Sequence, residues 1–159
     1  MKGNNGLGNI IERDEWQTLQ WLFDKLNEQY CFTIDCCANE DNKKCKFWTS
    51  FFEDVDKKGL KIYKIINCWM NPPFSKAKEM FEHFFKIVKK GVVIYRCDNM
   101  ETKIWQEVIF PNASWIFIPH KRIVYGGLIG KGARFPSAII GLNVDPIKNL
   151  SGTILKVKG

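Results

Sequence analysis

The stretch CWMNPPFSKAKEMFEHFFKIV, Cys68–Val88, joins an apolar run to an amphipathic segment through two consecutive prolines. Each proline fixes φ and lacks an N–H donor, so neither a strand nor a helix continues through the pair. The first proline also restrains the residue before it, Asn71, to extended geometry. The sequence therefore predicts a stiff corner that holds one amide, Asn71, and one aromatic ring, Phe74, at fixed positions.

The segments on either side of this corner predict a buried strand and a helix. The run IINCWM, Ile65–Met70, is nearly all apolar, as expected of a strand buried on both faces of a parallel sheet. After the corner, Ser75 occupies an N-cap position and Gly91 a helix end. Between them apolar residues recur at helical spacing, namely Met80, Phe81, Phe84, Phe85 and Val88.

The same alternation of helices and strands extends over the rest of the chain. Helical periodicity predicts helices over Trp16–Tyr30, which Thr18 would cap, and over Thr102–Phe110. Runs of β-forming residues predict strands at Cys31–Asp35, Phe47–Phe52, Val92–Arg96, Ser114–Ile118 and Ser137–Asn143. A Gly-rich basic loop, Tyr125–Phe135, separates the last two strands.

This order of elements predicts an α/β fold with a compact, open, mostly parallel sheet and helices on both faces. In such sheets ligands bind beyond the carboxyl ends of the strands. Asp35 and Asn71 each follow or end a predicted strand, so both side chains are expected to face one cleft.

Length and charge limit the possible classes. With 159 residues, the chain suffices for one domain, and we expect a flexible leader over residues 1–12 and a single domain over residues 13–159. The net charge of +7, from 24 Lys plus Arg against 17 Asp plus Glu, favours a polyanionic partner. No signal peptide is recognised and no apolar run reaches the roughly 20 residues that span a bilayer, so a cytoplasmic protein without membrane contact is expected.

The six cysteines form neither a Cys-x-x-Cys pair nor a disulfide framework. They fit buried small residues in a reducing compartment. A zinc site made of Cys31, Cys36, Cys37 and Cys45 is the alternative, but its spacing is not one that zinc sites commonly use. No metal is therefore expected.

The corner at Asn71 suits a planar base that carries an exocyclic amine. The Asn71 side-chain oxygen and the backbone carbonyl of Pro72 or Pro73 would accept hydrogen bonds from the amine and raise the electron density on its nitrogen. The Phe74 ring offers a surface for stacking, worth about 1–3 kcal/mol per base. A base that reaches such a site must leave the duplex stack. The alternative is a rigid turn with Phe74 in the core.

The chain resembles the phage-type DNA N6-adenine methyltransferases, relatives of the Dam enzymes, from about Asp14 to Asn143. The matching pieces are DEWQTLQWLFDKL, FTIDCCANEDNKKCKFWT, KGL, WMNPPFS, DNMETKIWQ, KRIVY and RFPSAII. The resemblance implies a methyltransferase catalytic domain with a Rossmann-like class I fold, S-adenosylmethionine as methyl donor and a direct transfer of methyl to N6 of adenine. No cysteine nucleophile is required.

The resemblance also implies roles for individual residues. The catalytic motif would be Asn71, Pro72, Pro73 and Phe74, with the target amine on Asn71 and the Pro72 carbonyl and the flipped adenine on Phe74. The cofactor would be bound by Trp16, Thr18, Asp35, Cys36, Ala38, Asp56 and Asn71. The sequence departs from the family in three places: Leu19 replaces a common proline, Phe74 a commoner tyrosine, and the loop DCCANED has no glycine.

Double-stranded DNA is the expected partner, and four basic residues near the Gly-rich loop are the expected phosphate contacts: Lys121, Arg122, Lys131 and Arg134. The alternative is a basic loop that is merely solvated. Two other functions stay open, namely methylation of another amine or amide, in RNA or a protein glutamine, and DNA binding without catalysis. The oligomeric state and the recognition sequence are not readable from the sequence.

Overall fold

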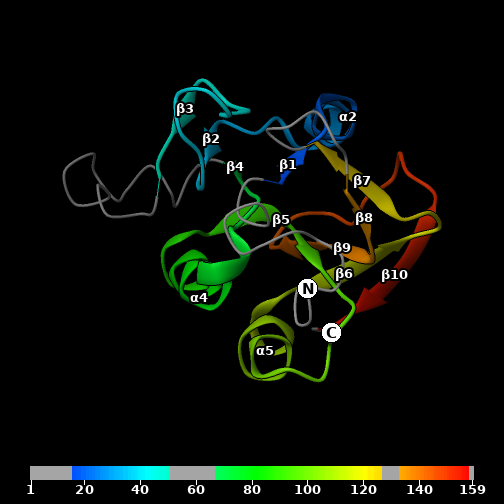
Figure 1. Cartoon of the computed structure of the whole chain (residues 1–159). Coiled ribbons are helices and arrows are strands. Elements are labelled where there is room, and N and C mark those ends of the chain that lie inside the picture. The colour runs from blue at the N-terminus through cyan, green and yellow to red at the C-terminus, as the bar shows by residue number, and fades with distance from the viewer. Residues whose placement is uncertain (1–15, 51–66, 127–132, 158–159) are drawn as a thin grey trace.

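The computed structural model describes residues 16–50, 67–126 and 133–157. Its strands form a seven-stranded sheet, in the order β10-β6-β9-β5-β4-β2-β3, and a three-stranded sheet, in the order β1-β7-β8 (Figure 1). The strands of the large sheet are β2 (Ile34–Asp35), β3 (Phe47–Trp48), β4 (Asn67–Met70), β5 (Lys90–Arg96), β6 (Trp115–Pro119), β9 (Ser137–Leu142) and β10 (Gly152–Lys156). The small sheet consists of β1 (Gln17–Thr18), β7 (Ile123–Gly126) and β8 (Ala133–Phe135).

The helices of the described part lie before and between these strands. They are α2 (Gln20–Tyr30), the 3₁₀ turn η2 (Phe74–Lys76), α4 (Ala77–Ile87), the π-helical segment η3 (Ile104–Ile109) and the short α5 (Phe110–Asn112). No helix in the described ranges has the length and apolar character needed to cross a membrane.

The large sheet is mixed, which corrects the predicted mostly parallel sheet. The pairs β3–β2, β2–β4 and β4–β5 are parallel, whereas β5–β9, β9–β6 and β6–β10 are antiparallel. The reason is the path of β9, which inserts between β5 and β6 and runs opposite to both. It follows that β6 runs in the same direction as β5, so the carboxyl ends of β2, β4, β5 and β6 lie at one edge of the sheet.

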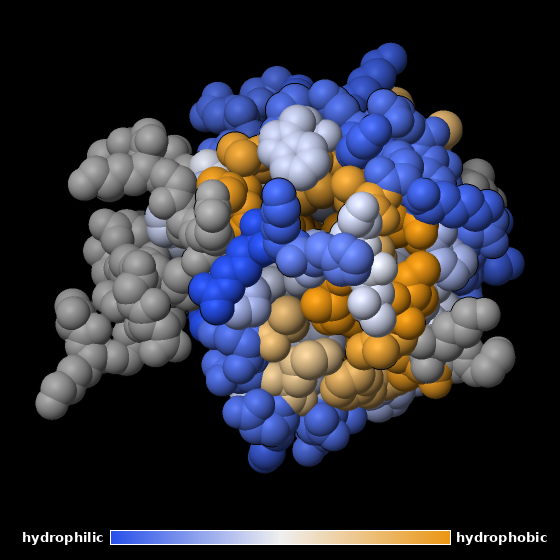
Figure 2. All heavy atoms as spheres, turned by 90° about the vertical axis from the view of Figure 1, so that its right-hand side faces the viewer, coloured by the Kyte–Doolittle hydropathy of each residue, from blue (hydrophilic) through white to orange (hydrophobic). Residues whose placement is uncertain are grey.

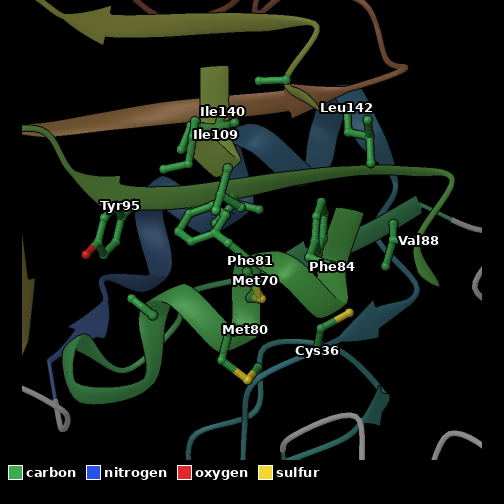
Figure 3. Close-up of a cluster of buried hydrophobic side chains, with 14 of the residues drawn as sticks. Cys36, Met70, Met80, Phe81, Phe84, Val88, Tyr95, Ile109, Ile140 and Leu142 are labelled. Atoms are coloured by element: carbon green, nitrogen blue, oxygen red, sulfur yellow. The ribbon is translucent and has the colours of Figure 1, made fainter. Parts of the chain in front are cut away.

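Helices cover both faces of the sheet, as predicted. Successive side chains of a strand point to opposite faces, so Trp69 of β4 packs with α2 while Met70 packs with α4. On the α4 side, Phe81 and Phe84 share one buried cluster with Ile109 of η3 and Ile140 of β9 (Figure 3). These two apolar layers fix the position of the strand that ends at Asn71.

Three predicted helix boundaries are wrong. α2 begins after the extended residue Leu19, with no side-chain cap, and Thr18 lies in β1, where it pairs with Tyr125. Ser75 lies inside η2, and Lys76 is the N-cap residue of α4.

Gly91 does not end α4, which stops at Ile87, but lies in β5. A Cβ atom there would lie 2.7 Å from the Cys68 carbonyl oxygen and 2.7 Å from the Phe84 ring. The glycine therefore allows close packing of β5 against β4 and α4.

The predicted Gly-rich loop is shorter than expected, because its two ends are the strands β7 and β8. The rings of Tyr125 and Phe135 stack across this hairpin, with centroids 4.4 Å apart and planes at 7°. β1 adds to the free side of β7, which brings a segment from before α2 to the carboxyl edge of the large sheet. Figure 2 views the molecule from the side that carries β7 and β10, where apolar surface surrounds a hollow.

Candidate active site

A cleft of about 290 Å³ lies at the carboxyl edge of β2 and β4, beneath β1. It brings together six of the predicted site residues: Trp16, Thr18, Asp35, Ala38, Asn71 and Pro73. The cleft also has walls that the sequence reading missed: Gln17, Cys37, Asn39, Asn42, Lys44, Ser50 and Trp69. The expectation that Asp35 and Asn71 face one cleft is confirmed.

The side chain of Asn71 is held by β1. Its Nδ2 atom donates to the Trp16 carbonyl oxygen at 3.3 Å and to the Thr18 hydroxyl at 3.1 Å. A carbonyl oxygen only accepts, so the amide nitrogen must face β1. The amide oxygen is consequently turned away from Trp16 and Thr18. Thr18 is buried, with 2% of its surface exposed, because it serves this contact rather than capping α2.

The two prolines set the direction of the backbone after Asn71. Pro73 is extended, with φ −65° and ψ 142°, and its carbonyl oxygen accepts from the Lys76 N–H at 3.2 Å to start η2. Pro72 is buried beside Asn71. Pro73 lines the cleft and Pro72 does not, and the Pro73 carbonyl already accepts one hydrogen bond within η2.

Phe74 lies beside the cleft rather than in its wall. The ring is half-buried and meets Phe135 edge-on at a centroid distance of 5.4 Å and Tyr95 at 6.2 Å. The Arg96 guanidinium carbon lies 5.1 Å from the ring centroid, over the ring. Arg96 is in turn fixed by Asp98, whose Oδ1 accepts from Nε at 2.6 Å and whose Oδ2 accepts from a terminal guanidinium nitrogen. Any base that stacks on this side of Phe74 must displace Arg96.

Asp35 closes the loop that follows β2. Its Oδ1 accepts from the Cys37 N–H at 3.1 Å and its Oδ2 from the Lys44 N–H at 3.0 Å. Among the described non-glycine residues, only Cys31 and Asn143 have positive φ, so residues 36–44 need no glycine. The hydrogen bonds of the carboxylate therefore stabilise a turn that, in a glycine-rich loop, would depend on the conformational freedom of glycine.

Burial raises the pKa of Asp35 to about 7, although the backbone N–H groups of Lys44 and Cys37 and the charge of Lys44 lower it. A carboxyl group whose pKa is higher in the folded chain than in the unfolded chain stabilises the fold below the unfolded pKa of about 4. That stabilisation is lost as the pH rises towards 7. We expect the free energy of unfolding of the unaltered protein, relative to Asp35→Asn, to be smaller at pH 8 than at pH 5.

Urea denaturation of both proteins at the two pH values measures this difference. Asp41→Asn, which removes an exposed carboxylate from the same loop, is the matched control for the removal of one charge. A stability difference between the unaltered protein and Asp35→Asn that stays constant or grows from pH 5 to pH 8 would contradict a raised pKa.

Lys44 is the cation of the cleft that the sequence reading missed. Its Nζ atom donates to Gln20 Oε1 at 3.2 Å. Burial lowers the pKa of Lys44, and the negative charges of Asp35 and Asp24 raise it by less. The polar connection from Ala38 to Lys46 carries no periodicity, so no pattern singled Lys44 out. The hydrogen bonds of Asp35 with Cys37 and Lys44, and that of the Ala38 N–H with the Thr49 carbonyl oxygen, hold this segment against β2.

The remaining predicted residues lie elsewhere. Cys36 is fully buried in the core and does not line the cleft, because it points to the opposite face from Asp35. Asp56 and Lys131 lie outside the described residues, and for Arg134 only the backbone, in β8, is described. Lys121 and Arg122 are exposed in the segment between β6 and β7. The described residues contain no group of three or more His, Cys, Asp or Glu side chains placed to hold a metal ion.

A family model described as DNA N-6-adenine-methyltransferase (Dam) matches residues 9–133. The chain belongs to this family. The matched range includes both walls of the cleft, from Trp16 to Pro73, and reaches into β8. Comparisons with curated proteins and with solved structures gave no match.

Membership in the Dam family confirms the resemblance read from the sequence. It makes the chain a member of a family of DNA adenine methyltransferases, for which DNA is the substrate and S-adenosylmethionine is generally the methyl donor. The Asn-Pro-Pro-Phe corner, the Asp35 loop and β1 thus lie within the family region.

Proposed function

We propose that this Dam-family chain transfers a methyl group from S-adenosylmethionine to N6 of an adenine that is turned out of duplex DNA and held by Asn71, Pro72, Pro73 and Phe74. The observation that carries this proposal is the fixed orientation of Asn71, whose amide nitrogen is engaged by Trp16 and Thr18. The amide oxygen is then available as a positioned acceptor. We further infer a Rossmann-like class I fold, which the parallel strands β2, β4 and β5 and the site at their carboxyl edge support.

The cleft residues fit the chemistry of S-adenosylmethionine, which combines a charged amino-acid end, a positive sulfur and a planar base. Lys44 and the amide side chains of Asn39 and Asn42 offer partners for the charged end, and the Trp16 indole offers aromatic surface. We infer that Trp16, Thr18, Asp35 and Ala38 bind the cofactor, with Asp35 acting by shaping the loop. When bound, the cofactor supplies an electrophilic methyl group. Cys36 and Asp56 remain part of the proposed cofactor set.

The protein's contribution to the chemistry is to hold and polarise the amine. The N6 lone pair is normally delocalised into the adenine ring, which makes the nitrogen a poor nucleophile. Two acceptors, Asn71 Oδ1 and the Pro72 carbonyl, would bind the two N6 hydrogens and favour electron density on the nitrogen. Because β1 and the prolines fix both acceptors before the base arrives, no reorganisation is needed during the reaction.

We infer that the flipped adenine stacks on Phe74 in the place that Arg96 occupies. Arg96 is tied to Asp98 and lies over the ring by a cation–π contact, which is worth from about 0.5 kcal/mol when exposed to about 2 kcal/mol when desolvated. Base–aromatic stacking is worth about 1–3 kcal/mol, so a base can compete with the guanidinium for this face of Phe74. The guanidinium would then be released towards the DNA backbone.

Positive charge lies along the same edge of the sheet. Asp98 has a lowered pKa, mainly because of its hydrogen bond with Arg96 and in smaller part because of the charge of Arg122. Arg122 thus lies near the carboxyl end of β5, beside the proposed base site. We propose that Lys121 and Arg122, with Lys131 and Arg134, contact DNA phosphates, which position a duplex without reading its sequence.

The glycine-free loop and Leu19, which replaces a common proline, favour the alternative of a DNA-binding protein without catalysis. The two hydrogen bonds of Asp35 close the loop without a glycine, which supports a cofactor site despite this composition. Methylation of another amine stays a distinct outcome of the assay described next.

The test is a methyl-transfer assay with purified protein, labelled S-adenosylmethionine and unmodified duplex DNA, followed by digestion to nucleosides and mass analysis. We expect labelled N6-methyladenine and no other methylated nucleoside. Label that enters RNA or protein glutamine but never DNA would overturn the proposed substrate. Absence of both product and cofactor binding, with DNA binding retained, would overturn the proposed reaction.

A further inference from the structure

A second hollow, which we call the Trp21 groove, lies between the start of α2 and the segment that joins β6 to β7. Its volume is about 990 Å³, and its walls include Leu19, Trp21, Leu22, Lys121, Arg122 and Ile123. It lies on the α2 side of the sheet, since Leu22 and Ile123 both belong to the core layer that packs there. Figure 2 shows apolar surface gathered around a hollow on this side of the molecule, bordered by hydrophilic side chains.

The floor of the groove is apolar and packed into the core. Leu22 and Ile123 are 2% and 5% exposed, and Ile139, which also lines the groove, is fully buried. Trp21 stands at the edge with 58% of its surface exposed, more than any other large hydrophobic residue of the described part. A large exposed aromatic residue beside an open apolar floor is typical of a binding surface rather than of a solvated face.

The rim of the groove is cationic. His120, Lys121 and Arg122 are consecutive, exposed and all line the groove. They follow the carboxyl end of β6, at the edge of the sheet where Asn71 and Arg96 lie. An indole next to a row of cations is the arrangement that binds single-stranded nucleic acid, where bases stack on aromatic rings and phosphates meet basic side chains.

Consecutive residues of β1 and the start of α2 line the cleft and the groove in turn. Thr18 faces the cleft and bonds to Asn71, whereas Leu19 and Trp21 face the groove. Leu19 also lies against β7, since a Cβ atom on Gly126 would be 3.4 Å from a Leu19 methyl group. A DNA strand bound in the groove would therefore contact residues that are next in sequence to Thr18, which holds Asn71.

We propose that the Trp21 groove binds a stretch of single-stranded DNA, with an unpaired base stacked on Trp21 and its phosphates on Lys121 and Arg122. This inference rests on the proposed function, because it takes the strand to be DNA next to a methylation site. A fully paired duplex would leave the apolar floor unused, since its bases are stacked on one another. An apolar protein segment would offer no anionic partner to Lys121 and Arg122. A single strand satisfies both features.

The test measures binding of an end-labelled oligothymidylate, on the order of 12 nucleotides long, by fluorescence anisotropy without S-adenosylmethionine. This strand has no adenine, so it does not require the Asn71 site. Trp21→Ala and Trp21→Gln are each expected to weaken binding about 10-fold, and Trp21→Phe to retain most of it, because a ring remains. Two non-aromatic variants are made so that poor folding of one leaves the other, and thermal melts verify the fold of each.

Phe47→Ala is the matched control, because Phe47 is 50% exposed and Lys46 lies over its ring at 5.7 Å, on the opposite edge strand of the sheet. Its binding is expected to be unchanged. Lys121→Ala with Arg122→Ala should reduce the slope of log K against log salt by about 0.7 for each phosphate that the protein no longer neutralises.

Unchanged binding of folded Trp21→Ala or Trp21→Gln would overturn the proposal, and so would an equal weakening in Phe47→Ala. If the Trp21 variants bind blunt duplex DNA as much more weakly as they bind the single strand, the proposed preference for a single strand is overturned. If the protein binds an RNA strand more tightly than the DNA strand, the assignment to DNA is overturned. If the protein makes N6-methyladenine but the Trp21 variants bind the single strand normally, the proposed role of the Trp21 groove is refuted and the proposed function is not. A protein that binds the strand through Trp21 but makes no product refutes the proposed function alone.

Discussion

Asn71→Ala is expected to lower the kcat of adenine methylation by at least about 10²–10³-fold, the range found when one preorganised polar group is removed from a reacting centre. The reason is that Asn71 Oδ1 is the side-chain acceptor proposed for the amine, and its contact strengthens as positive charge develops on N6. The decrease should fall mainly on kcat, because an interaction made in the transition state contributes little to ground-state binding. Single-turnover methylation of duplex DNA at saturating cofactor measures it.

The matched control is Asn67→Ala, in the strand β4 that precedes Asn71. Asn67 lies at the amino end of β4, where its amide donates to the Tyr30 carbonyl oxygen, away from the cleft. That variant loses a structural hydrogen bond, worth about 1 kcal/mol, and should retain its kcat. Comparable activity in folded Asn71→Ala and Asn67→Ala proteins would show that the corner does not bind the reacting amine.

The parts of the fold that the sequence predicts correctly are those with strong local periodicity. α4 carries its apolar residues at helical spacing, with Met80, Phe81 and Phe84 all fully buried. The strands before Asn71 and before Arg96 are apolar because each is covered on both faces. Since parallel strands end at one edge, the meeting of Asp35 and Asn71 also follows from the sequence.

The parts that the sequence does not predict depend on contacts between distant segments. Thr18 has the composition of a helix cap, yet it pairs with Tyr125 and bonds to Asn71, and neither partner is visible in its local pattern. The antiparallel direction of β9 likewise depends on the β7–β8 hairpin. The sequence predicts a loop there because the segment between the two strands is rich in glycine. The position of Arg96 over Phe74 is a side-chain contact between the end of β5 and η2, and periodicity carries no information about it.

Close packing around a glycine is likewise not predicted by the local sequence. Among the substitutions considered, Gly141→Ala has the largest expected effect on stability. Gly141 lies in β9, opposite Trp115 of β6. A Cβ atom at Gly141 would lie 2.0 Å and 2.2 Å from two carbon atoms of the Trp115 indole. The indole cannot easily move, because it is buried, stacks on Tyr30 at 6.4 Å and donates from Nε1 to the Val144 carbonyl oxygen at 2.7 Å.

Gly141→Ala is therefore expected to destabilise the protein by about 3 kcal/mol or more, at or above the upper end of the usual cost of overpacking. Gly126→Ala in β7 is the matched control. Its added Cβ atom would lie 3.4 Å from a Leu19 methyl group, an ordinary contact, so its free energy of unfolding should change by no more than about 1 kcal/mol. Urea denaturation of the two variants beside the unaltered protein measures both. Equal stability of the two variants would mean that Trp115 has room to move, and that β9 is not held against β6 by the close contact at Gly141.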